Sequence, residues 1–212
     1  VYEKSGKTYL VMANEGDTRE DDGDKARVKD TSLKNSSPSD LQQLNISTTD
    51  SSEGELLTFG GRSFTIRDEN GDIVFDSCNE LDAKAIELGI YDDNRSDDKG
   101  VEPEGVALLE IGGRTLAFIG LERTTQSAIA IYDITDPANA TFLDMIVDAG
   151  DLSPEGLQTF MMDGAYYLAV ANEVSGTTSL YRVAAVPEPE TWAMLLAGLG
   201  LVGFMGQRRK SA

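Results

Sequence analysis

Short apolar runs alternate with polar residues and turn-forming dipeptides along the first 185 residues. Such runs, bounded by Gly, Pro, Asn or Asp, are typical of short β-strands rather than helices. Residues 64–67 and 73–75 flank Asn70-Gly71 and predict a hairpin, because Asn-Gly favours the tight turn that joins antiparallel strands. The strand from 128 to 134 ends before Asp136-Pro137, a second turn. The pattern therefore predicts an all-β body.

One unit of this pattern occurs more than once. Pro103-Glu104-Gly105-Val106 precedes an apolar run that ends at Glu122, and Pro154-Glu155-Gly156-Leu157 precedes a run that ends at Glu173. In both copies the second glutamate lies 18 positions after the first, and the copies are 51 residues apart. Residues 9–15 resemble the second half of the unit and end at Glu15. Equal spacing indicates a repeated supersecondary unit.

The length of the repeat predicts the architecture. Roughly four strands in about 50 residues is the period of a β-propeller blade, so we expect a partial propeller. The chain opens at Val1 inside a half-copy, without an initiator Met or a signal segment. We therefore expect the sequence to be the C-terminal part of a longer protein, with a propeller-like domain over residues 1–185.

Two segments interrupt the strand pattern. Residues 15–55 are rich in Asp, Ser, Thr, Asn and Lys, which predicts a long, poorly packed excursion between strands of one blade. Residues 79–91 predict a short helix, with Asn79 as cap, Leu81, Ala85 and Leu88 on one face, and Gly89 at its end. We interpret both segments as decorations between strands.

Charge and composition exclude several functions. The chain has 37 acidic and 18 basic side chains and a net charge of −19, which argues against nucleic acid as a partner. It contains no histidine, so Ser-His-Asp catalysis and histidine-ligated metal sites are excluded. The single cysteine, Cys78, has no activating partner in the sequence and predicts an inert thiol.

The recurring carboxylates are the candidate chemistry. Some of these glutamates follow an inner strand and others begin one. In a propeller, equal positions in successive blades face one axis, so we expect these carboxylates to ring a channel mouth. Oxygen ligands in such a ring suit Ca²⁺ or Mg²⁺. The candidate metal ligands are Glu15, Asp97, Glu104, Glu122, Glu155 and Glu173. The alternative is structural: each glutamate accepts backbone N–H bonds or pairs with Arg19, Arg62, Arg114 or Arg123.

The C-terminal 27 residues form a separate segment, residues 186–212. Pro187-Glu188-Pro189 precedes an apolar run over 192–206, and Arg208-Arg209 follows it. The apolar run favours the hydrocarbon interior of a membrane, and the basic residues favour the cytoplasmic side of that membrane. The run is shorter than the length usually needed to span a bilayer. The alternative interpretation is therefore a helix buried in the protein core. The order resembles the PEP-CTERM sorting signal, which implies export, an exosortase-type sorting enzyme as partner, and membrane association through a hydrophobic helix.

The body also resembles a family, the choice-of-anchor I domain. The resemblance is carried by residues 9–20, 59–64, 95–105, 131–137 and 171–177. It implies a secreted, propeller-like module whose members end in different surface anchors, and some relatives are called atypical alkaline phosphatases or esterase-like. We expect a non-catalytic module at the bacterial surface that binds protein or polysaccharide. The alternative is a phosphoesterase in which channel carboxylates hold Ca²⁺ and Arg95 or Lys99 attracts phosphate.

Overall fold

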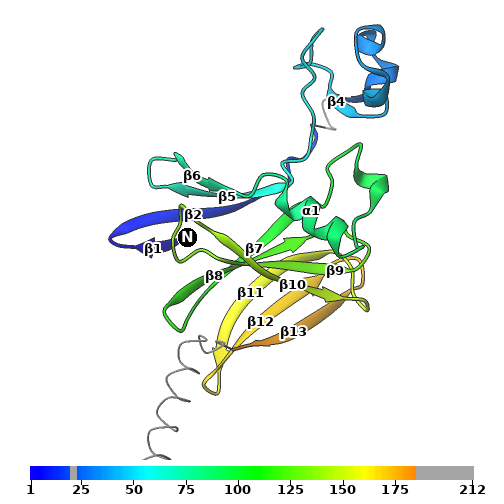
Figure 1. Cartoon of the computed structure of the whole chain (residues 1–212). Coiled ribbons are helices and arrows are strands. Elements are labelled where there is room, and N and C mark those ends of the chain that lie inside the picture. Colours follow the sequence, from blue (N-terminus) through cyan, green and yellow to red (C-terminus); the bar gives the residue numbers. More distant parts are fainter. Residues whose placement is uncertain (20–22, 185–212) are drawn as a thin grey trace, which may run out of the picture. The chain divides into compact units, whose positions relative to one another are not determined.

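The computed structural model describes residues 1–19 and 23–184, in which strands predominate and α1, Glu80–Glu87, is the one α-helix (Figure 1). The chain forms two units, Val1–Arg182 and Val183–Ala212. The strands are β1 Tyr2–Lys4, β2 Lys7–Asn14, β3 Lys25–Arg27, β4 Asn45–Ser47, β5 Ser63–Asp68, β6 Ile73–Asp76, β7 Pro103–Ile111, β8 Arg114–Leu121, β9 Ser127–Asp133, β10 Thr141–Asp148, β11 Pro154–Met162, β12 Ala165–Asn172 and β13 Thr177–Val183.

The first sheet has the order β1-β2-β5-β6 and is antiparallel throughout. Tyr9 pairs with Asp68 and Asn14 with Ser63, so the long strands β2 and β5 form its centre. The predicted hairpin is confirmed: β5 and β6 are joined through Asn70-Gly71, where the N–H of Gly71 donates to the Asp68 carbonyl. Gly71 has φ +88°, a conformation that glycine adopts without steric cost.

The second sheet, β10-β9-β8-β7, is a meander of four sequential antiparallel strands. The third sheet, β11-β12-β13, repeats the first three of these strands. Pro103 pairs with Leu121 and Pro154 with Asn172, and the register shifts immediately after each proline. The repeat read from the sequence is therefore a repeat of structure, and the prediction of a β-rich fold is confirmed, here as antiparallel sheets. The propeller itself is not shown.

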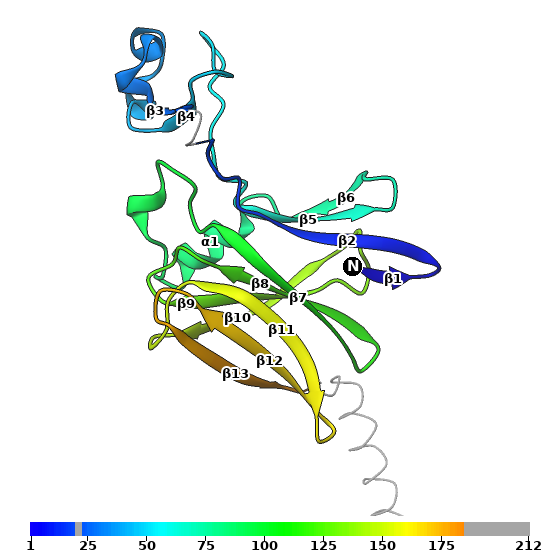
Figure 2. The same ribbon diagram turned by 180° about the vertical axis from the view of Figure 1, so that it is seen from behind.

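The three sheets lie side by side through their repeated strands. β7 packs against β2 on one side and against β11 on the other (Figure 2). Most of the core lies between the first and second sheets, where the ring centroids of Phe64 and Tyr132 are 4.6 Å apart. The Tyr132 hydroxyl donates to Glu80 of α1, which satisfies the one polar atom of this buried ring.

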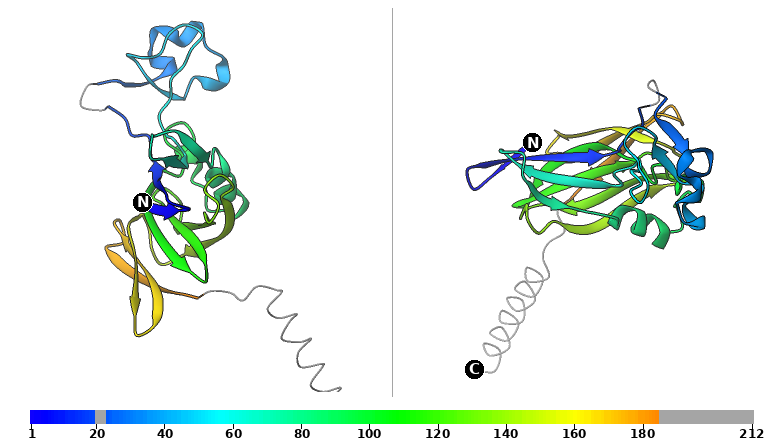
Figure 3. Two further views of the ribbon diagram at one scale, coloured as in Figure 1. Left: turned by 90° about the vertical axis from the view of Figure 1, so that its left-hand side faces the viewer. Right: turned by 90° about the horizontal axis from the view of Figure 1, so that it is seen from above.

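The excursion between β2 and β5 is better packed than expected. It leaves the first sheet after β2 and returns before β5 (Figure 3). Its strands β3 and β4 pair, and Val28 and Ile46 are fully buried. The Asp24 carboxylate accepts hydrogen bonds from Ser47, Thr48 and Thr49, so polar residues of a low-hydrophobicity segment satisfy one another.

The helix prediction is confirmed in position and wrong in two details. Asn79 lies at the N-cap but makes no side-chain capping bond. Leu81 and Ala85 are buried, whereas Leu88, at the C-cap, is 49% exposed. The helix lies between β6 of the first sheet and β7 of the second.

The predicted sorting motif and apolar run, residues 187–189, 192–206 and 208–209, lie outside the described residues. Among residues 1–19 and 23–184, no helix has the length and apolar character needed to cross a membrane.

Candidate functional site

A buried glutamate, Glu102, lies at the point where the chain enters β7. It is 1% exposed and has φ +50°, an uncommon conformation for a residue with a side chain. Its carbonyl accepts the N–H of Glu122 at 2.9 Å. Ser153, the equivalent residue of the next repeat, has φ +59°, and its carbonyl accepts the N–H of Glu173 at 2.8 Å. In both repeats, therefore, a residue with positive φ just before a strand holds the glutamate that follows the next strand, Glu122 after β8 and Glu173 after β12.

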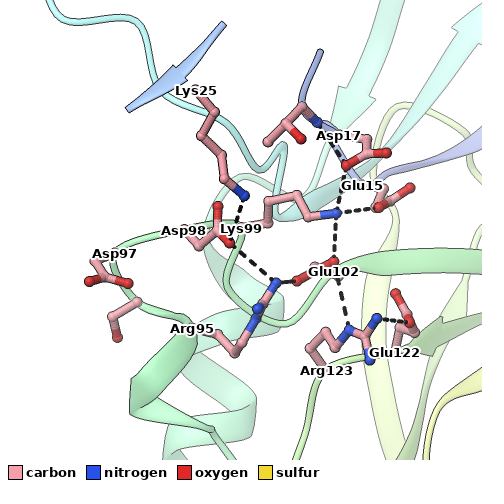
Figure 4. Close-up of polar contacts among 12 residues, drawn as sticks. Glu15, Asp17, Lys25, Arg95, Asp97, Asp98, Lys99, Glu102, Glu122 and Arg123 are labelled. Carbon is pink, nitrogen blue, oxygen red and sulfur yellow. Dashed lines mark hydrogen bonds and ion pairs between the residues drawn. The ribbon is translucent and has the colours of Figure 1, made fainter. Parts of the chain in front are cut away.

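Three cations surround the Glu102 carboxylate (Figure 4). Arg95 pairs with one oxygen, and Lys99 Nζ lies 2.8 Å from the other. Arg123 Nε lies 3.9 Å from that second oxygen. A carboxylate this deeply buried requires such pairing, because an unpaired charge inside a protein carries a large desolvation cost.

Lys99 connects this group to the end of β2. Its Nζ donates to Glu15 at 2.6 Å and to Asp17 at 2.9 Å, as well as contacting Glu102. Burial acts to lower the pKa of Lys99, but its hydrogen bonds to Glu102, Glu15 and Asp17 raise that pKa well above the ordinary value. Lys99 therefore remains a cation and holds two separate segments together.

A glycine permits this close approach. A Cβ on Gly60 would lie 2.6 Å from the Lys99 Cα, and Gly60 has φ +84°. Its N–H donates to the Gly16 carbonyl, beside Glu15. Any other residue at position 60 would push the returning chain away from Lys99.

Two further glutamates form a carboxyl pair beside this group. Glu122 is 6% exposed; Arg123 donates to it at 2.7 Å, and it shares a hydrogen bond with Glu104. Burial, opposed by Arg123 and reinforced by Glu104, raises the pKa of Glu122 to about 7. Burial and then the charges of Glu155 and Glu15 raise the pKa of Glu104. The two groups share a proton more readily than they carry two charges.

The structure brings together three of the six predicted carboxylates, Glu15, Glu104 and Glu122. Oxygens of Glu15, Glu102 and Glu122 lie within 4.8 Å of one another, which is a possible geometry for a metal ion. Glu104 adjoins them, and the charges of Glu155 and Glu173 act on it from the next repeat. We call Glu15, Lys99, Glu102, Glu104, Glu122 and their cationic partners Arg95 and Arg123 the ionic centre.

Asp97 does not join the ionic centre. In Figure 4 it lies apart from the dashed lines that join the residues of that centre. Asp97 pairs with Arg27 of β3, and its carbonyl accepts the N–H of Asn45 at 2.8 Å. These contacts attach the excursion to the loop before β7. The arginines considered as structural partners also divide: Arg123 pairs with Glu122, whereas the other three pair with aspartates. Those pairs are Arg19 with Asp24 and Asp50, Arg62 with Asp82, and Arg114 with Asp133.

Sequence reasoning missed the central role of Glu102, and it considered Arg95 or Lys99 only as phosphate-attracting residues of the phosphoesterase alternative. The available pattern was the spacing Arg95-x-x-x-Lys99-x-x-Glu102 directly before the repeated Pro-Glu-Gly. Nothing in that spacing shows that the loop folds back on its own acid, because the contact depends on the turn at residues 96–100.

The donors present test the fit of a cation. Hard carboxylate oxygens suit Ca²⁺. Both oxygens of Glu102 already contact Arg95 or Lys99, and the ammonium of Lys99 lies among Glu15, Asp17 and Glu102. A divalent cation at these oxygens therefore competes with Lys99 for the same ligands.

Comparison with known proteins defines the family. The choice-of-anchor I domain family matches residues 1–137, and the chain belongs to it. The PEP-CTERM protein-sorting motif matches residues 185–210. This motif marks an exported bacterial cell-surface protein that an exosortase recognises.

Two curated relatives are similar to parts of the chain. Gigasin-3a from Magallana gigas is 25% identical over 191 residues, which cover 70% of this chain and 66% of the relative. The mesenchyme-specific cell surface glycoprotein of Strongylocentrotus purpuratus is 33% identical over 114 residues, 51% of this chain and 12% of the relative. The chain thus spans just under two thirds of the first relative and a small part of the second. No solved structure matches.

Proposed function

We propose that the protein is a non-catalytic module displayed at the bacterial cell surface, where its loops bind polysaccharide or protein. The observation that carries the proposal is the ionic centre, in which the protein's own Lys99, Arg95 and Arg123 engage the buried carboxylates. Buried carboxylates paired in this way hold the loops in place. The sorting motif and the surface glycoprotein among its relatives support the location.

The ionic centre has a clear structural use in such a module. It joins the end of β2, the loop before β7 and the end of β8. Loops that start from a fixed base bind with a smaller loss of conformational freedom. We also infer that the repeated sheets are blades of a propeller, which is supported by the 51-residue repeat and by the contacts of β7 with β2 and β11.

Cell fractionation tests the display proposal. We expect the intact protein in the envelope, held through residues 192–206 or released after the exosortase acts, and a variant lacking residues 186–212 to be folded and soluble. A matched control replaces Arg208 and Arg209 with Gln, which keeps the apolar run and removes the basic end. Envelope retention of the truncated protein would contradict this location.

A cation-dependent phosphoesterase is the second candidate, favoured by the proximity of Glu15, Glu102 and Glu122. A bound Ca²⁺ would supply a Lewis acid for the activation of water, and Arg95 or Lys99, once displaced, would attract the phosphate. Such an ion would also stabilise the fold, by about 3 kcal/mol at a hundredfold excess over its dissociation constant.

One pair of measurements separates the candidates. Hydrolysis of a phosphomonoester and thermal unfolding are followed in Ca²⁺ and in EDTA. The display proposal predicts no hydrolysis and coincident unfolding curves. The phosphoesterase predicts hydrolysis and a higher melting temperature in Ca²⁺. Both should be lost in the Glu104→Gln, Glu122→Gln double variant and retained in a Glu87→Gln control, since Glu87 is an exposed residue of α1.

A further inference from the structure

Two glycines of the second sheet allow the third sheet to pack closely against it. A Cβ on Gly105 of β7 would lie 2.4 Å from the Glu155 carbonyl oxygen and 2.5 Å from Leu157 Cδ1. A Cβ on Gly120 of β8 would lie 2.4 Å from the Pro154 carbonyl oxygen. Real Cβ atoms do not approach backbone so closely, so the start of β11 reaches this sheet only because both positions lack side chains. We call Gly105 and Gly120 the first notch.

The third sheet carries the same feature one repeat later. Gly156 and Ala171 lie 51 positions after Gly105 and Gly120, and they face each other across the β11–β12 ladder. A Cβ on Gly156 would meet only the Cβ of Ala171, at 3.3 Å, within the same sheet. Both residues are exposed. We call Gly156 and Ala171 the second notch.

Further along the strands, this face of the third sheet also resembles the covered face of the second sheet. Leu109 and Leu116 on the second sheet are buried, at 8% and 9% exposure. Their equivalents, Phe160 and Tyr167, are half-buried and stack with their ring centroids 5.6 Å apart. Figure 2 shows β11 beside β7, with β12 and β13 on the side away from it. The third sheet thus presents a small-residue notch followed by an aromatic pair.

We propose that the second notch binds an extended polypeptide segment that begins with Pro-x-Gly and a branched aliphatic residue. The occupant follows from the first notch, where Pro154 and Glu155 present carbonyls to the two glycines and Leu157 lies over them. The register shift between Pro154 and Gly156 turns those carbonyls out of the ladder. Further along, Thr159 Oγ1 donates to the Leu108 carbonyl at 2.5 Å and fixes the direction of the strand.

A second copy of this chain does not supply the described segment. Its own Pro154–Leu157 segment already lies in its own first notch. The segment at Pro103 lies in the interior, with Pro103 and Gly105 both buried. Residues 20–22 and 185–212 contain no Pro-x-Gly sequence. The occupant is therefore a strand of this chemistry from another polypeptide.

The test uses the intact chain and a peptide with the sequence of residues 152–160, carrying Gln in place of Glu155. The change to Gln avoids bringing a further carboxylate to Glu155 and Glu173. We expect saturable binding by fluorescence anisotropy. Ala171→Leu fills the second notch and should weaken binding at least tenfold, whereas Thr178→Leu, on exposed β13, should change it less than twofold.

A change in the peptide keeps the test independent of protein folding. Replacing the leucine that corresponds to Leu157 by alanine should weaken binding about tenfold, because the notch loses its apolar contact. A scrambled peptide that binds equally well would overturn the proposal, as would an absence of binding. Self-association of the peptide-free chain that Ala171→Leu abolishes would identify a second copy as the occupant and would also overturn it.

Discussion

The second and third sheets contain copies of one repeat with the same residue spacing, but the two copies lie in different environments. At the entry to β7, Gly105 and Gly120 are buried beneath β11, whereas Gly156 and Ala171 at the entry to β11 are exposed. Glu122 is 6% exposed and Glu173 is exposed, although the same backbone hydrogen bond holds both. The comparison teaches that the repeat dictates strands and turns, while the neighbouring sheet dictates burial.

The repeats also differ in charge at one equivalent position. Glu102 and Ser153 share a left-handed backbone conformation, but only Glu102 brings a carboxylate into the protein. That carboxylate organises Arg95, Lys99 and Arg123. A repeated backbone geometry thus serves an ionic centre in one copy and a simple strand entry in the other.

Equivalent glycines should show the largest difference between the two repeats. We expect Gly105→Ala to lower the free energy of unfolding by about 3 kcal/mol, because the new methyl group overlaps the Glu155 carbonyl. Gly156→Ala should change it by less than about 0.5 kcal/mol, because that position faces solvent. Urea denaturation of both variants measures the difference, and equal losses would contradict the comparison.

The ionic centre should show the next largest effect. Lys99→Met leaves Glu102, Glu15 and Asp17 without their shared cation and should cost about 2 kcal/mol, with Arg95 still paired to Glu102. Lys84→Met removes a surface pair with Glu87 and should cost much less, because solvent screens that pair. If the Lys99→Met, Glu102→Gln double variant loses the sum of the single effects, the pair is not coupled.

The pH dependence of stability should report the burial of Glu122 in the second sheet. The pKa of Glu122 is raised from 4.5 to about 7 in the folded protein, so between these values the folded chain binds more protons than the unfolded chain. Stability should therefore fall as the pH rises from about 4.5 to about 7 and level off above that range. No histidine titrates in this window.

Unfolding by urea in EDTA at several pH values measures this slope. Glu122→Gln should flatten it, because the group whose pKa is raised is then absent. The same slope in Glu122→Gln as in the wild type would place the titrating group elsewhere.

The smallest effect is expected at Asp97, outside the ionic centre. Asp97→Asn removes an ion pair with Arg27 in which both side chains are about one third exposed. Solvent weakens such pairs, so the free energy of unfolding should fall by less than about 1 kcal/mol. A loss as large as that of Lys99→Met would show that the excursion and the sheets unfold as one tightly coupled unit.

Much of the fold was predictable because its determinants are local. Asn70-Gly71 predicted the β5–β6 hairpin, and the two Pro-Glu-Gly segments predicted the starts of β7 and β11. The capping by Asn79 and the burial of Leu88 were wrong, since both depend on how α1 meets the sheets. The packing within residues 15–55 was underestimated, because Asp24 is satisfied by residues more than twenty positions away.

The sequence by itself determined the repeat, the acidic balance, the absence of histidine and the sorting motif, because these depend only on residue types and spacing. Only the tertiary structure decided that Glu15, Glu104 and Glu122 meet while Asp97 pairs elsewhere. It also decided that Lys99 and Arg95 neutralise Glu102, and that one notch is filled and the other exposed. The physical reason is that charge pairing and burial depend on which distant segments pack together, and a one-dimensional pattern does not contain those neighbours.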